Sequence, residues 1–268
     1  MSTVLVPRPA ATVMVVRDGA GSLEVLMLRR RLRSEFVRGA YVFPGGALDE
    51  EDRQPAMLAR CSGRDDAQAS RVLELDQGGL GYWVCAFREC FEEAGVLVAD
   101  GSAGPLHFDD PGIESRFAEH RRALNAGERS FLDICRQEEL TLPADALTYV
   151  GHWITPEGPP RRYDTRFFVA LAPEGQTAVH DEVETVDHMW VPPAEALERQ
   201  ESGEIELMFP TVWNLRLLAQ FDRADQLVAS VAALGPVPTI QPTVVINEGG
   251  QRQVTVGIEP PEPGGAGG

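Results

Sequence analysis

Residues 86–96 read AFRECFEEAGV and place one arginine and three glutamates on a short segment. On a helix, Glu89 shares a face with Glu92 and Glu93, which follow it by three and four positions. Like charges at these spacings destabilise an isolated helix by roughly a few tenths of a kcal/mol per pair. A divalent cation reverses that repulsion, because Mg²⁺ and Mn²⁺ prefer oxygen ligands, and Arg88 can orient one carboxylate. By itself, the pattern fits a cation site or a solvated acidic face.

An upstream segment, FPGGALDEED at residues 43–52, combines a glycine turn with acidic residues. Together with RECFEEAGV at residues 88–96, it resembles the two halves of the Nudix box. That box is the signature of hydrolases that cleave a nucleoside diphosphate linked to another moiety. The second half fits the pattern R-E-U-x-E-E-x-G-U, where U is apolar. In the first half, Gly46 matches the box glycine, and Asp52 stands where the family usually has glutamate.

The two half-boxes are farther apart than in an uninterrupted Nudix box. An uninterrupted box would place the arginine at position 60, and it stands at position 88, so 28 extra residues separate the halves. The peroxisomal acyl-CoA diphosphatase branch of the family carries an insertion at the same place. The segments HWITPEGPPRRYDTRFF and LMFPTVWNLRLLAQF are also similar to that branch. The resemblance covers most of residues 8–222.

The resemblance implies an α/β fold, namely a Nudix-type α/β/α sandwich with a mixed sheet. We expect a Nudix hydrolase domain over residues 1–235, a hairpin over 236–258 and a flexible tail over 259–268. The insertion, about residues 53–80, is either a lid that faces the substrate or a surface elaboration. Extra helices at about 111–139 would shape an acyl pocket or a dimer interface.

The resemblance also implies a metal site. Glu89 and Glu93 match the main metal ligands of the family, and Glu92 matches a further or water-mediated ligand. The backbone carbonyl of Gly46 is a fourth candidate ligand, and Arg88 would orient a carboxylate. The implied cofactor is Mg²⁺ or Mn²⁺, which polarises phosphoryl oxygens and lowers the pKa of a bound water. The general base of this family often lies outside the box.

A general base and a phosphate-binding group are expected farther along the chain. Glu184, with Glu182 behind it, is the candidate general base. Arg161 and Arg162 are candidates for substrate binding, because arginine forms bidentate contacts with phosphate oxygens. Arg166 fits the same role, or it pairs with the nearby Asp164.

A partial motif bears on the substrate. Many bacterial CoA-cleaving Nudix enzymes carry L-L-T-x-R-[SA]-x3-R-x3-G-x3-F-P-G-G, and this chain keeps Arg30, Gly39 and the final FPGG. It departs from the motif at Leu28, Arg31 and Glu35. The interrupted box favours CoA or acyl-CoA as substrate, while nucleotide sugars, dinucleotide cofactors and ADP-ribose stay open. A catalytically idle Nudix-fold module that binds or senses a nucleotide metabolite is the alternative function.

Periodicity predicts the elements that position these residues. Steps of three and four between apolar positions predict a helix over residues 80–94, which Gly95 ends. Residues 47–79 are polar and indicate at most one short helix. Alternating or continuous apolar runs predict strands at 10–18, 23–31, 40–46, 147–156, 162–173 and 183–192. Further helices are predicted at 112–127, 128–140, 192–203, 207–221 and 223–234.

The net charge and the distribution of apolar residues indicate which kinds of partner the chain can bind. A net charge of −17 argues against broad binding to nucleic acid or to an anionic membrane, because both need a basic surface. No apolar run reaches the roughly 18 residues of a membrane span, and the first residues do not resemble a secretory signal, so we expect a cytoplasmic protein. The four cysteines form no C-x-x-C pair and are expected to be buried free thiols. A homodimer is a further expectation.

Overall fold

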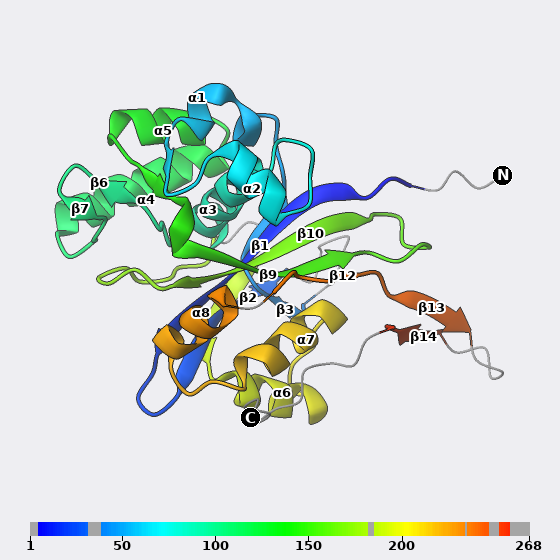
Figure 1. The fold of residues 1–268 in the computed structure, drawn as a ribbon. Coiled ribbons are helices and arrows are strands. Elements are labelled where there is room, and N and C mark those ends of the chain that lie inside the picture. The colour runs from blue at the N-terminus through cyan, green and yellow to red at the C-terminus, as the bar shows by residue number, and fades with distance from the viewer. Residues whose placement is uncertain (1–4, 32–38, 182–184, 234, 247–251, 258–268) are drawn as a thin grey trace.

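The computed structural model describes residues 5–31, 39–181, 185–233, 235–246 and 252–257 (Figure 1). Its central sheet contains β1 (Arg8–Asp18), β2 (Leu23–Arg30), β3 (Tyr41–Val42), β4 (Gly45–Ala47), β9 (Leu147–Ile154), β10 (Tyr163–Leu171), β11 (Thr185–Val191) and β12 (Thr239–Ile240). The strand order is β11-β2-β1-β10-β9-β12, with β3 beside β2 and β4 beside β1.

The sheet is mixed, as predicted. The central strands β1 and β10 run parallel, with Arg8 opposite Tyr163 and Val16 opposite Leu171. The short strand β12 is parallel to β9. The remaining pairs are antiparallel, namely β2 with β1, β3 and β11, β4 with β1, and β9 with β10. The segment predicted as one strand at 40–46 forms β3 and β4 instead. Pro44 separates them, and proline has no N–H with which to continue a ladder.

Helices cover both faces of the sheet, which gives the α/β/α sandwich (Figure 1). One face carries α1 (Pro55–Leu58), α2 (Asp66–Val72), α3 (Leu80–Ala94), α4 (Pro111–Asn125) and α5 (Phe131–Gln137). The other face carries α6 (Pro193–Glu201), α7 (Phe209–Leu218) and α8 (Ala224–Ala232). Among the described residues, no helix is long and apolar enough to cross a lipid bilayer.

The alternation of side chains along β1 divides the core in two. Val13 and Val15 belong to a cluster with Trp83 of α3, while Met14 belongs to a second cluster with Leu215 of α7. Each cluster therefore occupies one side of the sheet, and α3 is held against the strands by the first of them.

The insertion between the half-boxes contains more regular structure than its composition suggested. It holds a 3-10 turn η1 (Glu51–Arg53), α1, β5 (Cys61–Ser62) and α2. The helix α2 begins with a capping box, in which Asp65 and Gln68 accept hydrogen bonds from each other's backbone N–H. The prediction of at most one short helix was wrong because these short elements are stabilised by neighbours, such as β8 (Leu142–Pro143) beside β5.

The remaining described elements are small. They are β6 (Asp100–Gly101), β7 (Gly104–Pro105), η2 (Ala144–Ala146), β13 (Thr243–Ile246) and β14 (Arg252–Thr255). Strand β13 pairs antiparallel with β14, so the predicted C-terminal hairpin is present, although its turn lies outside the described residues. The division of the chain into domains stays a prediction. All four cysteines are free thiols; Cys61 is half-buried and the other three are buried.

Candidate active site

The second half-box lies on α3, and the insertion caps the start of that helix. Asp66 accepts hydrogen bonds from the backbone N–H of Gly78 and Leu80, at 3.0 and 2.9 Å. Ser70 accepts another from Gly79 at 2.9 Å. A carboxylate at a helix N-terminus satisfies free N–H groups and complements the helix dipole. At the other end Gly95 adopts φ 68°, the left-handed conformation that glycine tolerates, so α3 ends where the sequence predicted.

Arg88 joins the two half-boxes. Its guanidinium donates two hydrogen bonds to Asp52, both 2.8 Å long, and it also donates to Glu89 at 2.8 Å and to Glu92 at 3.1 Å. A further bond reaches the carbonyl of Ala47 at 3.1 Å. Bidentate pairing of this kind is the geometry that the arginine fork favours. Asp52 therefore reaches Arg88 although it is one methylene shorter than glutamate.

The glycines of the first half-box contact the carboxylates of the second. A Cβ atom on Gly46 would lie 2.5 Å from Glu89 Oε1, so any larger residue at position 46 would displace that carboxylate. The backbone N–H of Gly45 donates to Glu93 Oε2 at 2.9 Å. Folding thus brings together Gly46, Arg88 and all three helix glutamates, as the box resemblance implied.

Burial raises the pKa of two of the helix glutamates, Glu89 and Glu92. Desolvation raises the pKa of Glu89 to about 7, with Arg88 opposing the shift and Glu92 adding to it. Burial is also the main cause of the raised pKa of Glu92. Mg²⁺ and Mn²⁺ prefer carboxylate oxygens as ligands, and a bound cation would stabilise the ionised form of these buried glutamates. Within the part of the chain that the structure describes, however, no three acidic, histidine or cysteine side chains converge as ready-made metal ligands. Two of the glutamates are turned onto Arg88 instead.

The raised pKa of Glu89 predicts how stability depends on pH without metal. The folded state holds this proton up to about pH 7, whereas the unfolded chain releases it near 4.5. The folded state therefore binds more protons between these values, and its stability falls as pH rises from about 4.5 to about 7. We expect the melting temperature in EDTA to fall across this window by more in the wild type than in Glu89→Gln. A constant difference between the two proteins from pH 5 to 8 would contradict the assignment.

The helix α4 braces the C-terminal end of α3. Arg121 donates to the backbone carbonyls of Glu92 and Glu93 at 2.9 and 2.8 Å, and Asn125 donates to the former at 3.1 Å. Cations near a helix C-terminus satisfy its free carbonyls and complement its dipole. The sequence predicted the helix but not this contact, because no motif links Arg121 to the box.

The remaining predicted site residues are three arginines and two glutamates, and the glutamates lie outside the described residues. Arg162 is buried and donates to the carbonyls of Thr155 and Leu5 at 3.0 and 2.7 Å. Arg30 is half-buried at the end of β2, and Arg161 is exposed. The general-base candidates Glu182 and Glu184 fall outside the described residues. The roles of all five stay predictions.

Arg166 pairs with Asp164, one of the two arrangements open from sequence. Asp164 also accepts a hydrogen bond from His152 Nε2 at 2.6 Å, so the three side chains form one polar row across β9 and β10, with His152 and Arg166 buried and Asp164 half-buried. The guanidinium of Arg166 lies 5.4 Å from the ring centre of Tyr82 on α3. Tyr82 precedes Glu89 by seven positions and therefore lies on the same helix face.

The chain belongs to the Nudix family, because the NUDT19 Nudix domain model matches residues 64–218. It is 31% identical over 239 residues to the human protein "Acyl-coenzyme A diphosphatase NUDT19", a match that covers 78% of this chain and 64% of that protein. The chicken protein of the same name is 27% identical over 264 residues, covering 82% and 70% of the two chains. The chain thus spans slightly under two thirds of the length of the human relative.

A solved structure supports the fold. The crystal structure of a NUDIX hydrolase from Alicyclobacillus acidocaldarius matches with a TM-score of 0.64 and 28% identity, covering 87% of this chain and 99% of that one. The predicted α/β/α fold and the resemblance to the interrupted-box branch are therefore confirmed.

Proposed function

We propose that this chain is a divalent-metal-dependent diphosphatase that hydrolyses the diphosphate linkage of CoA or acyl-CoA. The observation that carries the proposal is the pairing of Asp52 with Arg88, at 2.8 Å, which assembles the interrupted box around three glutamates on one helix face. The printed names of the human and chicken relatives support the choice of CoA derivatives.

In this proposal Glu89, Glu92 and Glu93, with the Gly46 carbonyl, hold Mg²⁺ or Mn²⁺. The ion would polarise the phosphoryl oxygens and lower the pKa of an attacking water. Arg88 holds the carboxylates in place and keeps its charge. Burial lowers its pKa, but the hydrogen bonds that it donates to Asp52 and the negative charges of Glu89 and Asp52 outweigh burial and raise its pKa.

Residues outside the box carry out proton transfer and phosphate binding in this proposal. Glu184, backed by Glu182, accepts the proton of the attacking water. The water oxygen forms a new bond to one phosphorus, and the bond from that phosphorus to the bridging oxygen breaks. The products are adenosine 3′,5′-bisphosphate and a phosphopantetheine. Arg30, Arg161 and Arg162 contact substrate phosphates in this proposal, and a homodimer and a cytoplasmic location belong to it as well.

A catalytically idle binding module is the competing function, and fold alone does not separate the two. The box favours hydrolysis, because a binding module has no need for three glutamates on one helix face, of which two have a pKa raised chiefly by burial. The Asp52 substitution does not weaken this argument, since its carboxylate forms the same bidentate pair with arginine.

A substrate panel tests the proposal. CoA, acyl-CoAs, NADH, ADP-ribose and nucleotide sugars would each be incubated with Mg²⁺, with Mn²⁺ and with EDTA, and the products identified by mass. We expect cleavage of CoA or acyl-CoA with either metal, at least about tenfold slower cleavage of the others, and no cleavage in EDTA. Absence of cleavage of every compound under both metals would contradict the proposal and favour the binding-module alternative.

A further inference from the structure

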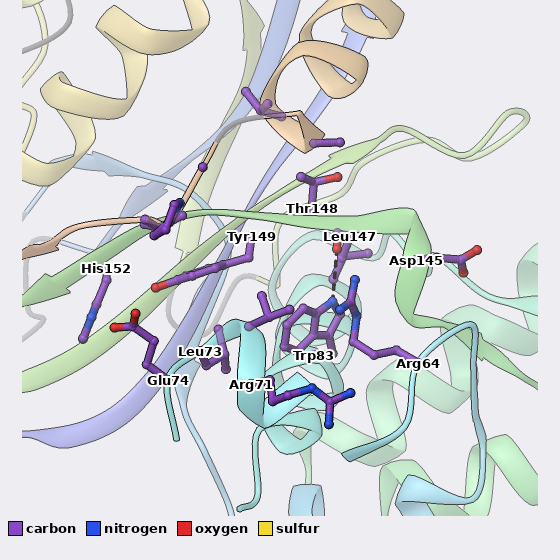
Figure 2. Close-up of a pocket in the computed structure, with 16 residues that line it drawn as sticks. Arg64, Arg71, Leu73, Glu74, Trp83, Asp145, Leu147, Thr148, Tyr149 and His152 are labelled. Carbon is purple, nitrogen blue, oxygen red and sulfur yellow. Dashed lines mark hydrogen bonds between the residues drawn. The ribbon is translucent and has the colours of Figure 1, made fainter. Parts of the chain in front are cut away.

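The box helix α3 borders a pocket on one side and carries the box glutamates on another. The pocket has a volume of about 460 Å³, and its lining includes Trp83 of α3 with Glu74, Tyr149 and His152 (Figure 2). At about 100° per residue, the side chains of Trp83 and Glu89 point about 120° apart around the helix. The pocket therefore does not hold the glutamates in place, and the contacts that do so lie on other sides of α3.

Two of the three glutamates lie in the last turn of α3, where a helix constrains its residues least. Glu92 and Glu93 come directly before Ala94, the last residue of the helix. The last carbonyls of a helix have no N–H partner one turn farther along, so this end frays unless other groups bind them. Glu89 lies one turn earlier, inside the helical hydrogen-bond ladder. The two later glutamates therefore depend on support from outside α3.

The neighbouring helix α4 provides that support. Arg121 Nε donates to the carbonyl of Glu92 at 2.9 Å, and Arg121 Nη2 donates to the carbonyl of Glu93 at 2.8 Å. The side-chain amide of Asn125 donates to the carbonyl of Glu92 at 3.1 Å. Because the donors of a guanidinium are held in one plane, Arg121 fixes the two carbonyls relative to each other as well as to α4.

The glycine of the second half-box leaves room for this contact. A Cβ atom on Gly95 would lie 3.0 Å from Arg121 Nη1 and 3.4 Å from its Cζ, so a side chain at this position would push the guanidinium away from the last turn. Gly95 also adopts the left-handed conformation that ends α3. One residue of the box thus ends the helix and leaves its last carbonyls open to a cation from another helix.

The backbone and the carboxylate of Glu93 are held by different elements. Arg121 binds the backbone, while the N–H of Gly45 donates to Glu93 Oε2 at 2.9 Å. Glu92 has the same support at its backbone, so a rotation of its side chain suffices to turn its carboxylate from Arg88 to a cation. Groups that hold metal ligands in this way typically change metal affinity about 10- to 100-fold when they are removed.

We propose that Arg121, assisted by Asn125, is a positioning residue that holds Glu92 and Glu93 where they bind the divalent cation. This inference rests on the proposed function. It gives α4 a role in the metal site, whereas the sequence suggested an acyl pocket or a dimer interface for the extra helices. In this role Arg121 acts through the backbone of the two glutamates and contacts neither the cation nor the substrate.

The test measures by calorimetry how tightly the protein binds Mn²⁺. The variants are Arg121→Ala and Arg121→Lys. Arg122→Ala is the matched control, because Arg122 is 55% exposed and pairs with Glu119 and Glu128, neither of which lies on α3. We expect Arg121→Ala to raise the Kd for Mn²⁺ by about 10- to 100-fold. Arg121→Lys should raise it by less than about fivefold, since an ammonium group still donates to a carbonyl, and the control should leave it unchanged.

Kinetics separate positioning from a general loss of folded protein. In Arg121→Ala, the Mg²⁺ concentration for half-maximal cleavage of CoA should rise in step with the Kd for Mn²⁺. The value of kcat at saturating Mg²⁺ should change by less than about threefold. A loss of folded enzyme would instead lower kcat and leave the metal dependence unchanged. A melting curve identifies the temperature range in which each variant is folded.

An unchanged affinity for Mn²⁺ in folded Arg121→Ala, or an equal loss in Arg122→Ala, would overturn the inference. If Arg121→Ala does not fold, Asn125→Ala decides, because it removes one hydrogen bond at an exposed position and should weaken Mn²⁺ binding by about threefold. An unchanged affinity in that variant would also overturn the inference, as would a wild type that binds no Mn²⁺. If the wild type binds Mn²⁺ but cleaves no compound, the proposed function fails, and the calorimetric comparison still tests Arg121.

Discussion

Replacing Glu93 by glutamine is expected to lower kcat/KM for CoA by about a thousandfold while the protein stays folded. Glu93 lies on the helix face that it shares with Glu89, and its charge is the property that a hard divalent cation needs. A neutral amide is a much weaker ligand for such a cation. Metal assistance contributes several kcal/mol to phosphoryl transfer, and about 4 kcal/mol corresponds to a thousandfold in rate.

The fold of this variant is expected to survive because glutamine can keep the hydrogen bond that Glu93 accepts from Gly45. Glu93 Oε2 accepts a hydrogen bond from the backbone N–H of Gly45 at 2.9 Å, and the amide oxygen of glutamine can accept the same bond. Steady-state kinetics with Mg²⁺ and a melting curve measure the two effects separately. Glu51→Gln is the matched control, since Glu51 is exposed and makes no contact with the box helix glutamates. Unchanged metal-dependent turnover in Glu93→Gln would rule out its assigned role.

The sequence predicted the box helix well because two local signals agree there. Apolar positions repeat with the helical period from Leu80, and Gly95 provides the left-handed residue that ends the helix. The resemblance of the two half-boxes to the Nudix box also implied that Arg88 and the glutamates would meet Gly46 in space. Both predictions need only the local sequence pattern and a motif, and neither needs the tertiary structure.

The insertion and the support of the helix ends could not be predicted in the same way. Residues 47–79 are polar, and their short elements depend on contacts such as the hydrogen bond from the Gly79 N–H to Ser70. Arg121 reaches the carbonyls of the box helix from α4, a contact that depends on how two helices pack. The pocket beside Trp83 combines three segments distant in sequence, so no local pattern indicates it.

Replacing Asp52 by alanine is expected to reduce the free energy of unfolding by about 3–5 kcal/mol. Asp52 is 1% exposed and accepts two hydrogen bonds of 2.8 Å from Arg88, and it accepts a third from the backbone N–H of Asp49 at 2.9 Å. Alanine leaves a buried guanidinium without its bidentate partner. Removing one member of a buried ion pair is costly chiefly because the remaining charge stays desolvated.

Two further variants separate this cause from a general effect of lost charge. Asp49 lies 3.7 Å from the same guanidinium but is 65% exposed, so Asp49→Ala should cost less than about 1 kcal/mol. Adding Arg88→Met to Asp52→Ala should recover none of the loss, because Glu89 and Glu92 then lose the arginine from which they accept hydrogen bonds. Urea unfolding measures all three proteins, with the slope m reporting any change in compactness. A loss below about 1 kcal/mol in Asp52→Ala would mean that contacts other than this ion pair hold the interrupted half-boxes together.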